Sequence, residues 1–349
     1  MPDQCLTMKQ IPPNNLLPTN KLAACFNKTS ATYKFYWLLA IIQYVESGKC
    51  LITKRELFSA MISIAWYTVN YFHVSFGKQD KLQRAIEKIK ELENLTIDAK
   101  KDDILEKLIQ TTNKFTLKEL YYFDNQVPHW FLSPWFPGKN RNEIYKQSHQ
   151  FNNYCPYSID KDYINVNLLW ANYFVENAGV IKDFCWWNLA MYLQTKNPSV
   201  PDIPNKLIKP ALRSSLFKQK AQFWDIVLEE LGSINCIYTN NLLQMGNYAM
   251  EHFVPFNFVS HDLIWNLIPA DRAFNSSKGD KLPQINKYFD RFYDLQESAI
   301  NIVSSKQPKN KYLEEYLTIF PDMEITKIRY RETLQPLITI AANNGFEYL

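Results

Sequence analysis

The spacing of hydrophobic and polar residues along the chain is typical of a mainly helical protein. Phe217, Ala221, Trp224, Leu228 and Leu231 recur at intervals of four and three, so they share one face of a helix that Gly232 ends. Comparable patterns predict further helices at residues 31–46, 51–71, 81–94, 102–111, 167–177, 182–195, 285–303, 313–320 and 330–342. We therefore expect helices on both sides of any other element.

The pattern changes after Gly232. Residues 235–241, read Asn-Cys-Ile-Tyr-Thr-Asn-Asn, form a short β-like run followed by polar turn residues. We place a domain boundary there and expect a mainly α protein with a small α+β unit. The expected parts are a flexible lead-in at 1–26, a helical domain at 27–232, a second domain at 233–303 and C-terminal helices at 304–349.

Residues 124–140 contain three prolines and four large aromatic residues, which excludes a long helix. We predict an ordered loop. Trp130, Trp135 and Phe136 could stack on nucleic-acid bases, but bulky aromatic residues beside prolines more often belong to a core. A cluster of basic residues fits a phosphate-binding surface and an ordinary solvated face equally well. Its members are Lys206, Lys209, Arg213, Lys218 and Lys220.

Composition and charge exclude few classes of protein. Hydrophobic residues make up 46% of the 349 residues, and the net charge of +4 is compatible with a nucleic-acid partner without requiring one. The longest apolar run, residues 35–42, is too short to span a bilayer, and the N-terminus shows no secretory signal. The six cysteines form no C-x-x-C pair, so we expect no structural zinc. We expect a soluble, cytoplasmic protein with no membrane partner.

Residues 250–283 carry the residues best suited to catalysis. Glu251 and His252 are adjacent, Asn266 follows fourteen residues after His252, Asn275 nine residues later, and Lys278 three further on. Hydrolysis of a phosphodiester needs a base for water, and an imidazole can serve near neutral pH. Glu251 and Asn275 offer oxygen ligands for a hard cation, Mg²⁺ or Mn²⁺. Because neighbours on a strand point to opposite faces, a bulge or twist near Pro255 would be needed to bring Glu251 and His252 together.

This pattern resembles the HNH endonuclease family, which has a ββα-metal fold. The spacing, with Asn rather than His at the last position, is similar to the HNH domain of RNA-guided CRISPR effector nucleases. The resemblance covers about 50 residues. Unlike relatives with zinc knuckles, the chain has Cys236 alone, and it has Glu251 where many members have Asp. Packing on the helical domain is therefore expected to hold the small domain together.

The resemblance implies a metal-dependent endonuclease that acts on DNA. His252 would activate water, Glu251 and Asn275 would hold the metal, and Asn266 would tie the loop between the strands and orient His252. Arg272, Lys278 and Lys281 lie on or near the helix expected around Phe274 and are candidates for contacts with phosphate.

Three functional interpretations remain open at this point. Standalone proteins with a helical domain and an HNH domain suggest restriction or anti-phage defence, by analogy only. The alternatives are a nucleic-acid-binding or sensor protein with a degenerate HNH scaffold, and a nuclease subunit that cuts only with a partner protein or as a homodimer.

Overall fold

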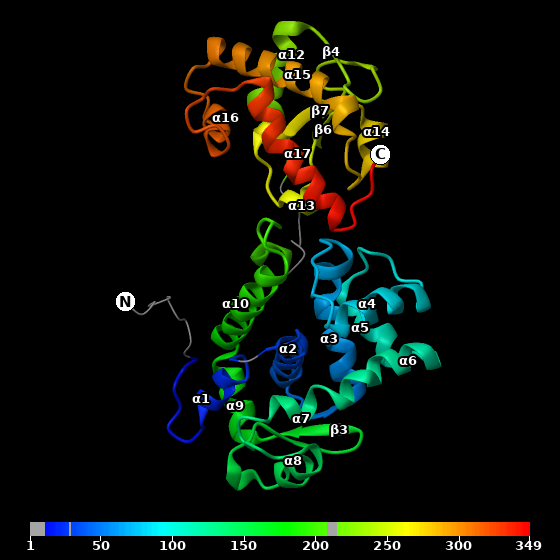
Figure 1. Ribbon diagram of the computed structural model, residues 1–349, viewed down its shortest axis with the longest axis vertical. Helices are drawn as coiled ribbons and strands as arrows, with labels where there is room; N and C mark the ends of the chain where they lie inside the picture. Colours follow the sequence, from blue (N-terminus) through cyan, green and yellow to red (C-terminus); the bar gives the residue numbers. More distant parts are fainter. Residues whose placement is uncertain (1–10, 28, 208–214) are drawn as a thin grey trace. The chain divides into compact units, whose positions relative to one another are not determined.

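The computed structural model describes residues 11–27, 29–207 and 215–349. The chain divides into two compact units: unit 1 comprises Met1–Pro198 and Ile203–Lys209, and unit 2 comprises Ser199–Asp202 and Pro210–Leu349. Both contain mainly helices, with small antiparallel sheets (Figure 1). The expected fold class is therefore confirmed.

Unit 1 is built around two long helices, α2 (Tyr33–Glu46) and α3 (Lys54–Asn70), which pack against each other. Nearly every apolar side chain of α2 is buried, because other helices cover it on several sides. Thr53 and Glu56 form a capping box at the start of α3. The predicted helix at 51–71 is thus correct from Lys54 onward, whereas its first three residues form a strand.

The remaining helices of unit 1 surround this pair or follow it in the chain. Their bounds are α1 Thr19–Ala24, α4 Lys81–Leu92, α5 Lys101–Gln110, α6 Lys114–Tyr121, α7 Pro128–Phe131, α8 Arg141–Ser148, α9 Leu168–Glu176 and α10 Ala178–Lys196. Short 3₁₀ turns cover Tyr122–Asn125 (η1), Phe151–Asn153 (η2) and Pro204–Lys206 (η3). Residues 1–10 of the expected lead-in lie outside the described residues, while α1 buries Leu22.

One small sheet belongs to unit 1. Its strands are β1 (Leu51–Thr53), β2 (Tyr157–Ile159) and β3 (Tyr163–Val166), in the antiparallel order β1-β3-β2. The loop before it contains Trp135 and Phe136, which are both buried, so the interpretation of these two as core residues holds. Trp130 is about half exposed.

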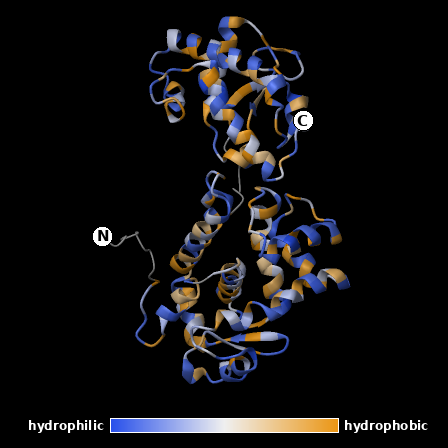
Figure 2. Cartoon of the chain, viewed as in Figure 1, coloured by the Kyte–Doolittle hydropathy of each residue, from blue (hydrophilic) through white to orange (hydrophobic). Residues whose placement is uncertain are grey.

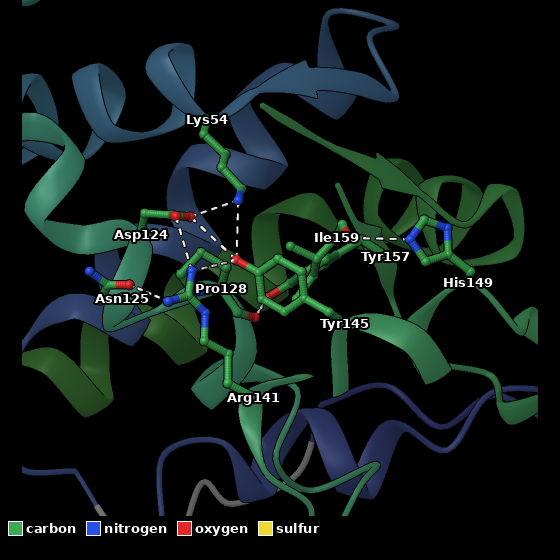
Figure 3. Close-up of polar contacts among 9 residues, drawn as sticks. All are labelled: Lys54, Asp124, Asn125, Pro128, Arg141, Tyr145, His149, Tyr157 and Ile159. Carbon is green, nitrogen blue, oxygen red and sulfur yellow. Dashed lines mark hydrogen bonds and ion pairs between the residues drawn. The ribbon is translucent and has the colours of Figure 1, made fainter. Parts of the chain in front are cut away.

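A partly buried ionic cluster links α3 to η1 and α8 (Figure 3). The Lys54 side chain is only 1% exposed and its ammonium lies 2.7 Å from the Asp124 carboxylate. Arg141 also pairs with Asp124, at 3.2 Å, and the Tyr145 hydroxyl accepts hydrogen bonds from both cations. Buried charges are tolerated when they are paired in this way, so the cluster fixes the relative positions of α3, η1 and α8.

Unit 2 begins with the helical segment predicted from the spacing of its apolar residues. It comprises α11 (Phe217–Gln219), a π-helical turn (η4, Lys220–Trp224) and α12 (Asp225–Leu231), and Gly232, with φ of +72°, ends it. The other helices are α13 Phe256–Val259, α14 Arg272–Lys278, α15 Ile285–Lys306, α16 Lys311–Glu314 and α17 Lys327–Asn343, with 3₁₀ turns η5 Ile264–Asn266 and η6 Glu315–Thr318.

Two two-stranded sheets complete unit 2: β4 (Ile234–Asn235) with β5 (Leu242–Leu243), and β6 (Ala249–His252) with β7 (Leu267–Ala270). Every residue of β7 is buried, and hydrophobic residues mark this region in Figure 2. The Gln296 side chain on α15 donates to the Leu267 carbonyl (2.9 Å). Helix α15 therefore helps to hold β7 in place, and the expected packing on the helical domain at 27–232 stays a prediction.

The basic residues at 206–220 do not share one environment. Lys206 is buried, Lys218 is exposed, and Lys220 pairs with Asp225 at 2.9 Å. Lys209 and Arg213 lie outside the described residues. Among the helices that the structure describes, none is both long and apolar enough to cross a membrane.

Candidate active site

The strand pair β6–β7 and helix α14 form a ββα arrangement. The pairing is antiparallel and regular, with Glu251 opposite Ile268 and His252 opposite Leu267. Helix α14 packs against β6, starts at the cap residue Asp271, and ends at Gly279. The Phe274 N–H donates to the Asp271 carboxylate and lowers the pKa of Asp271.

The regular ladder shows no bulge between Glu251 and His252, in contrast to the bulge or twist that the sequence suggested. The two side chains consequently have different partners, as expected for strand neighbours. Glu251 accepts the Lys278 ammonium, at 2.5 Å, whereas His252 Nε2 lies 2.9 Å from Asp262 Oδ1. The ammonium also donates to the His252 carbonyl oxygen, at 3.0 Å. Lys278 thus contacts both members of the Glu-His pair.

Lys278 was expected near phosphate, but its side chain is fully buried and that of Glu251 is 6% exposed. A buried pair of this kind neutralises both charges locally. Arg272 and Lys281 are exposed, and the Arg272 guanidinium donates to the Gly246 carbonyl oxygen at 2.6 Å. In this structure, Arg272 and Lys281 are accessible to a phosphate and Lys278 is not.

Asn266 is completely buried and is the last residue of η5, directly before β7. Its side-chain oxygen accepts from the Val254 N–H and its amide donates to the Val254 carbonyl, both at 2.8 Å. Its own carbonyl accepts from the Phe253 N–H, also at 2.8 Å. These bonds hold the segment that leaves β6 directly after His252, so they limit the positions that the imidazole can adopt.

The residues present provide oxygen donors for a divalent cation. Asn275 is half-buried on α14, about one helical turn before Lys278, which is the residue of this helix that contacts Glu251. Among the described residues, no group of three or more His, Cys, Asp and Glu side chains gathers as a ready ligand set. Glu251 and Asn275 carry side-chain oxygens of the kind that a hard divalent ion prefers, but in this structure the Glu251 carboxylate is paired with Lys278.

Three further polar residues of the site were not found from the sequence. Asp262 contacts His252, Glu315 accepts the Ile264 N–H at 2.6 Å, and Gln296 donates to the carbonyl of Leu267. Burial raises the pKa of Glu315. Glu315 and Gln296 lie outside residues 250–283, and Asp262 is separated from His252 by a loop, so local spacing carried no signal for any of them.

Comparison with known proteins identifies this part of the chain. Residues 233–284 match the model of the HNH endonuclease family. This range includes every candidate site residue: Glu251, His252, Asn266, Asn275 and the basic residues Arg272, Lys278 and Lys281. No curated protein and no solved structure matches the chain. The family resemblance is thereby confirmed for these residues, whereas the particular similarity to CRISPR effectors stays a prediction.

Proposed function

Because residues 233–284 are an HNH endonuclease domain, we propose that this protein is a metal-dependent endonuclease that cuts DNA, with His252 as general base. The observation that carries the proposal is the family match over the segment that holds every candidate residue. HNH nucleases generally depend on a divalent metal, which here would be Mg²⁺ or Mn²⁺ held by Glu251 and Asn275. The bound ion would stabilise negative charge on the scissile phosphate.

The chain's own residues divide the remaining work. The imidazole of His252 accepts a proton from the attacking water, and Asn266 fixes the backbone beside it. The oxygen of that water forms a bond to phosphorus while the bond to the leaving oxygen breaks. Arg272 and Lys281, both exposed near α14, bind the flanking phosphates and hold the strand in register.

The test is cleavage of plasmid DNA with Mg²⁺ or Mn²⁺, with and without a chelator. Removal of a general base typically lowers the rate by about two to four orders of magnitude, so we expect His252→Ala to lose detectable cleavage while remaining folded. His149→Ala serves as the control, because His149 lies in unit 1 with about half of its side chain exposed. Undiminished cleavage by His252→Ala would show that His252 is not the general base.

One observation favours a second function. The Glu251 carboxylate already has a buried partner in Lys278, as it would in a domain that has lost its metal. Such a protein would bind nucleic acid and not cut it. Binding of labelled DNA with no cleavage under any metal condition favours this scaffold function. Cleavage that appears only with a co-purifying protein favours a nuclease subunit.

The biological role follows only by analogy. We propose restriction or anti-phage defence, as the resemblance to standalone HNH proteins implies. A bacterial host expressing the wild-type protein should reduce phage plating efficiency, and His252→Ala should restore it. Equal phage plating efficiency on hosts that express the wild type and His252→Ala would contradict a role in defence.

A further inference from the structure

We infer that Asp262 is a positioning residue for the nuclease reaction: its carboxylate accepts a hydrogen bond from the Nε2–H of His252 and leaves Nδ1 as the atom that accepts the proton of water. The inference rests on the proposed function, because it assigns a role within the same site. It adds a residue and an atom that the family match does not supply. The Nδ1 edge of the imidazole then faces the attacking water.

The geometry of the pair supports a directed hydrogen bond. His252 Nε2 and Asp262 Oδ1 are 2.9 Å apart, and their side chains are 10% and 20% exposed. An ionised carboxylate can only accept hydrogen bonds, so the ring nitrogen that faces it must carry the proton. In a neutral imidazole the other nitrogen then has a free lone pair. The ring is also packed edge-on against Phe256, with centroids 5.5 Å apart.

The loop that carries Asp262 is fastened by side chains from three other elements. Gln219 donates to the Asp262 main-chain carbonyl at 3.3 Å, and Glu315 accepts the N–H of Ile264 at 2.6 Å. Gln296, which is completely buried, donates to the Ile264 carbonyl at 3.4 Å, directly after this loop. A hydrogen-bonding partner orients a catalytic side chain only if it is itself held, and these contacts hold it.

The assigned tautomer gives a balanced first step. Water loses a proton to Nδ1 while its oxygen forms a bond to phosphorus. The leaving oxygen departs with the electron pair of the broken bond and takes a proton from solvent. The Asp262 carboxylate stabilises the imidazolium formed in this step, as acidic partners of histidine do in hydrolases. Asp262 itself touches neither water nor phosphate.

Kinetics of the full-length protein test this role. Loss of a supporting contact to a catalytic histidine typically lowers activity by about 10- to 100-fold, so kcat of Asp262→Ala should fall by that factor. KM should stay within about twofold, because Asp262 does not bind the substrate. Asp262→Asn, which keeps the shape and an acceptor oxygen, should lie between wild type and Asp262→Ala. The control is Asp280→Ala, which deletes a different carboxylate of the same domain, in the turn after α14.

A spectroscopic measurement is independent of activity. Selective ¹⁵N labelling of the five histidines, with the His252 signals assigned by their absence in His252→Gln, reports which ring nitrogen carries the proton. We expect protonated Nε2 in the metal-free wild type and a mixture of tautomers in Asp262→Ala. Protonated Nδ1 in the wild type, or an unchanged kcat in Asp262→Ala, would overturn the inference. If the wild type cuts no DNA, the proposed function fails, but the tautomer measured by NMR still tests the hydrogen bond between His252 and Asp262.

Discussion

At the scale of single residues, the ion pair between Glu251 and Lys278 is the main feature of the candidate site, because both side chains are buried and each has the other as its charged partner. The spacing of Glu251, His252, Asn266 and Asn275 predicted a site in one short segment, and the family match covers that segment. The same spacing suggested that Lys278 would face phosphate, because lysines on short helices are usually solvated. Its burial depends on Glu251, a partner 27 residues earlier in the chain, and on how α14 packs against β6. Local sequence cannot specify that packing.

The buried pair predicts a large and asymmetric effect of mutation. Removal of one partner from a buried ion pair leaves the other charge unpaired, which typically costs about 3–5 kcal/mol of stability. Lys278→Met should therefore lower the free energy of unfolding of unit 2 by about that amount, measured by urea denaturation.

A second variant separates charge from packing. In the double variant Glu251→Gln/Lys278→Met both charges are absent, so we expect recovery of more than half of the lost stability. Lys281→Met, at an exposed position, should change stability by less than about 0.5 kcal/mol. If the stability lost in the double variant equals the sum of the losses in the two single variants, Glu251 and Lys278 do not stabilise each other.

At the scale of elements, helices with a clear apolar face were predicted to within a few residues. Helix α4 begins at Lys81 as expected, because Asp80 caps it. The strand at Leu51–Thr53 was missed because it pairs with residues 163–165, far along the chain. The short helices α6 and α8 were missed as well, since two turns are marginal on local preference and depend on packing. Non-local contacts account for each of these differences.

The Asn266 side chain links the segment after β6 to the start of β7, so its removal should destabilise both. Asn266→Ala removes the only side chain that the structure shows bonded to both backbone groups of Val254, which is itself fully buried. Buried polar groups left without partners cost about 1–3 kcal/mol each, so we expect a loss of about 2–4 kcal/mol in urea unfolding. Asn275→Ala is the matched control: it should abolish metal-dependent cleavage while changing stability by less than about 1 kcal/mol. Equal destabilisation by both would contradict these roles.

At the scale of the whole molecule, the two units carry different chemistry. Unit 1 holds the ionic cluster of Figure 3, and unit 2 holds the HNH domain. The sequence predicted a helical part and a nuclease part. It did not reveal the cluster, because Lys54, Asp124 and Arg141 come from three segments that meet only in the folded chain.

His129 in unit 1 predicts how stability depends on pH. Burial and the nearby charges of Arg141 and Lys54, against the opposing effect of Asp124, together lower its pKa to about 4. Between pH 6.5 and 4 the unfolded chain therefore binds more protons at this position than the folded chain does. The stability that neutral His129 provides is complete above about pH 6.5 and is lost as the pH falls towards 4.

At about 1.4 kcal/mol per pKa unit, the change from 6.5 to about 4 corresponds to about 3.5 kcal/mol, and solvent screening reduces the expected loss to about 2–3 kcal/mol. Urea unfolding of the full chain, followed by circular dichroism across this range, measures it. In His129→Phe the decline with falling pH should be smaller by that amount, whereas His149→Gln, half exposed in the same unit, should leave it unchanged. A pH profile of His129→Phe identical to that of the wild type would contradict the prediction.

The matched HNH domain provides one candidate base per chain, and this determines the products expected from duplex DNA. The two strands are antiparallel, so a site that fits one scissile phosphate cannot engage the opposite strand without rebinding or a second copy. A two-fold symmetric dimer would present two such sites. For a single copy, supercoiled plasmid should become open circles first, with linear DNA appearing later at a rate proportional to protein concentration. Linear product that forms directly, with a rate that rises as the square of protein concentration, would instead show that two chains cut together.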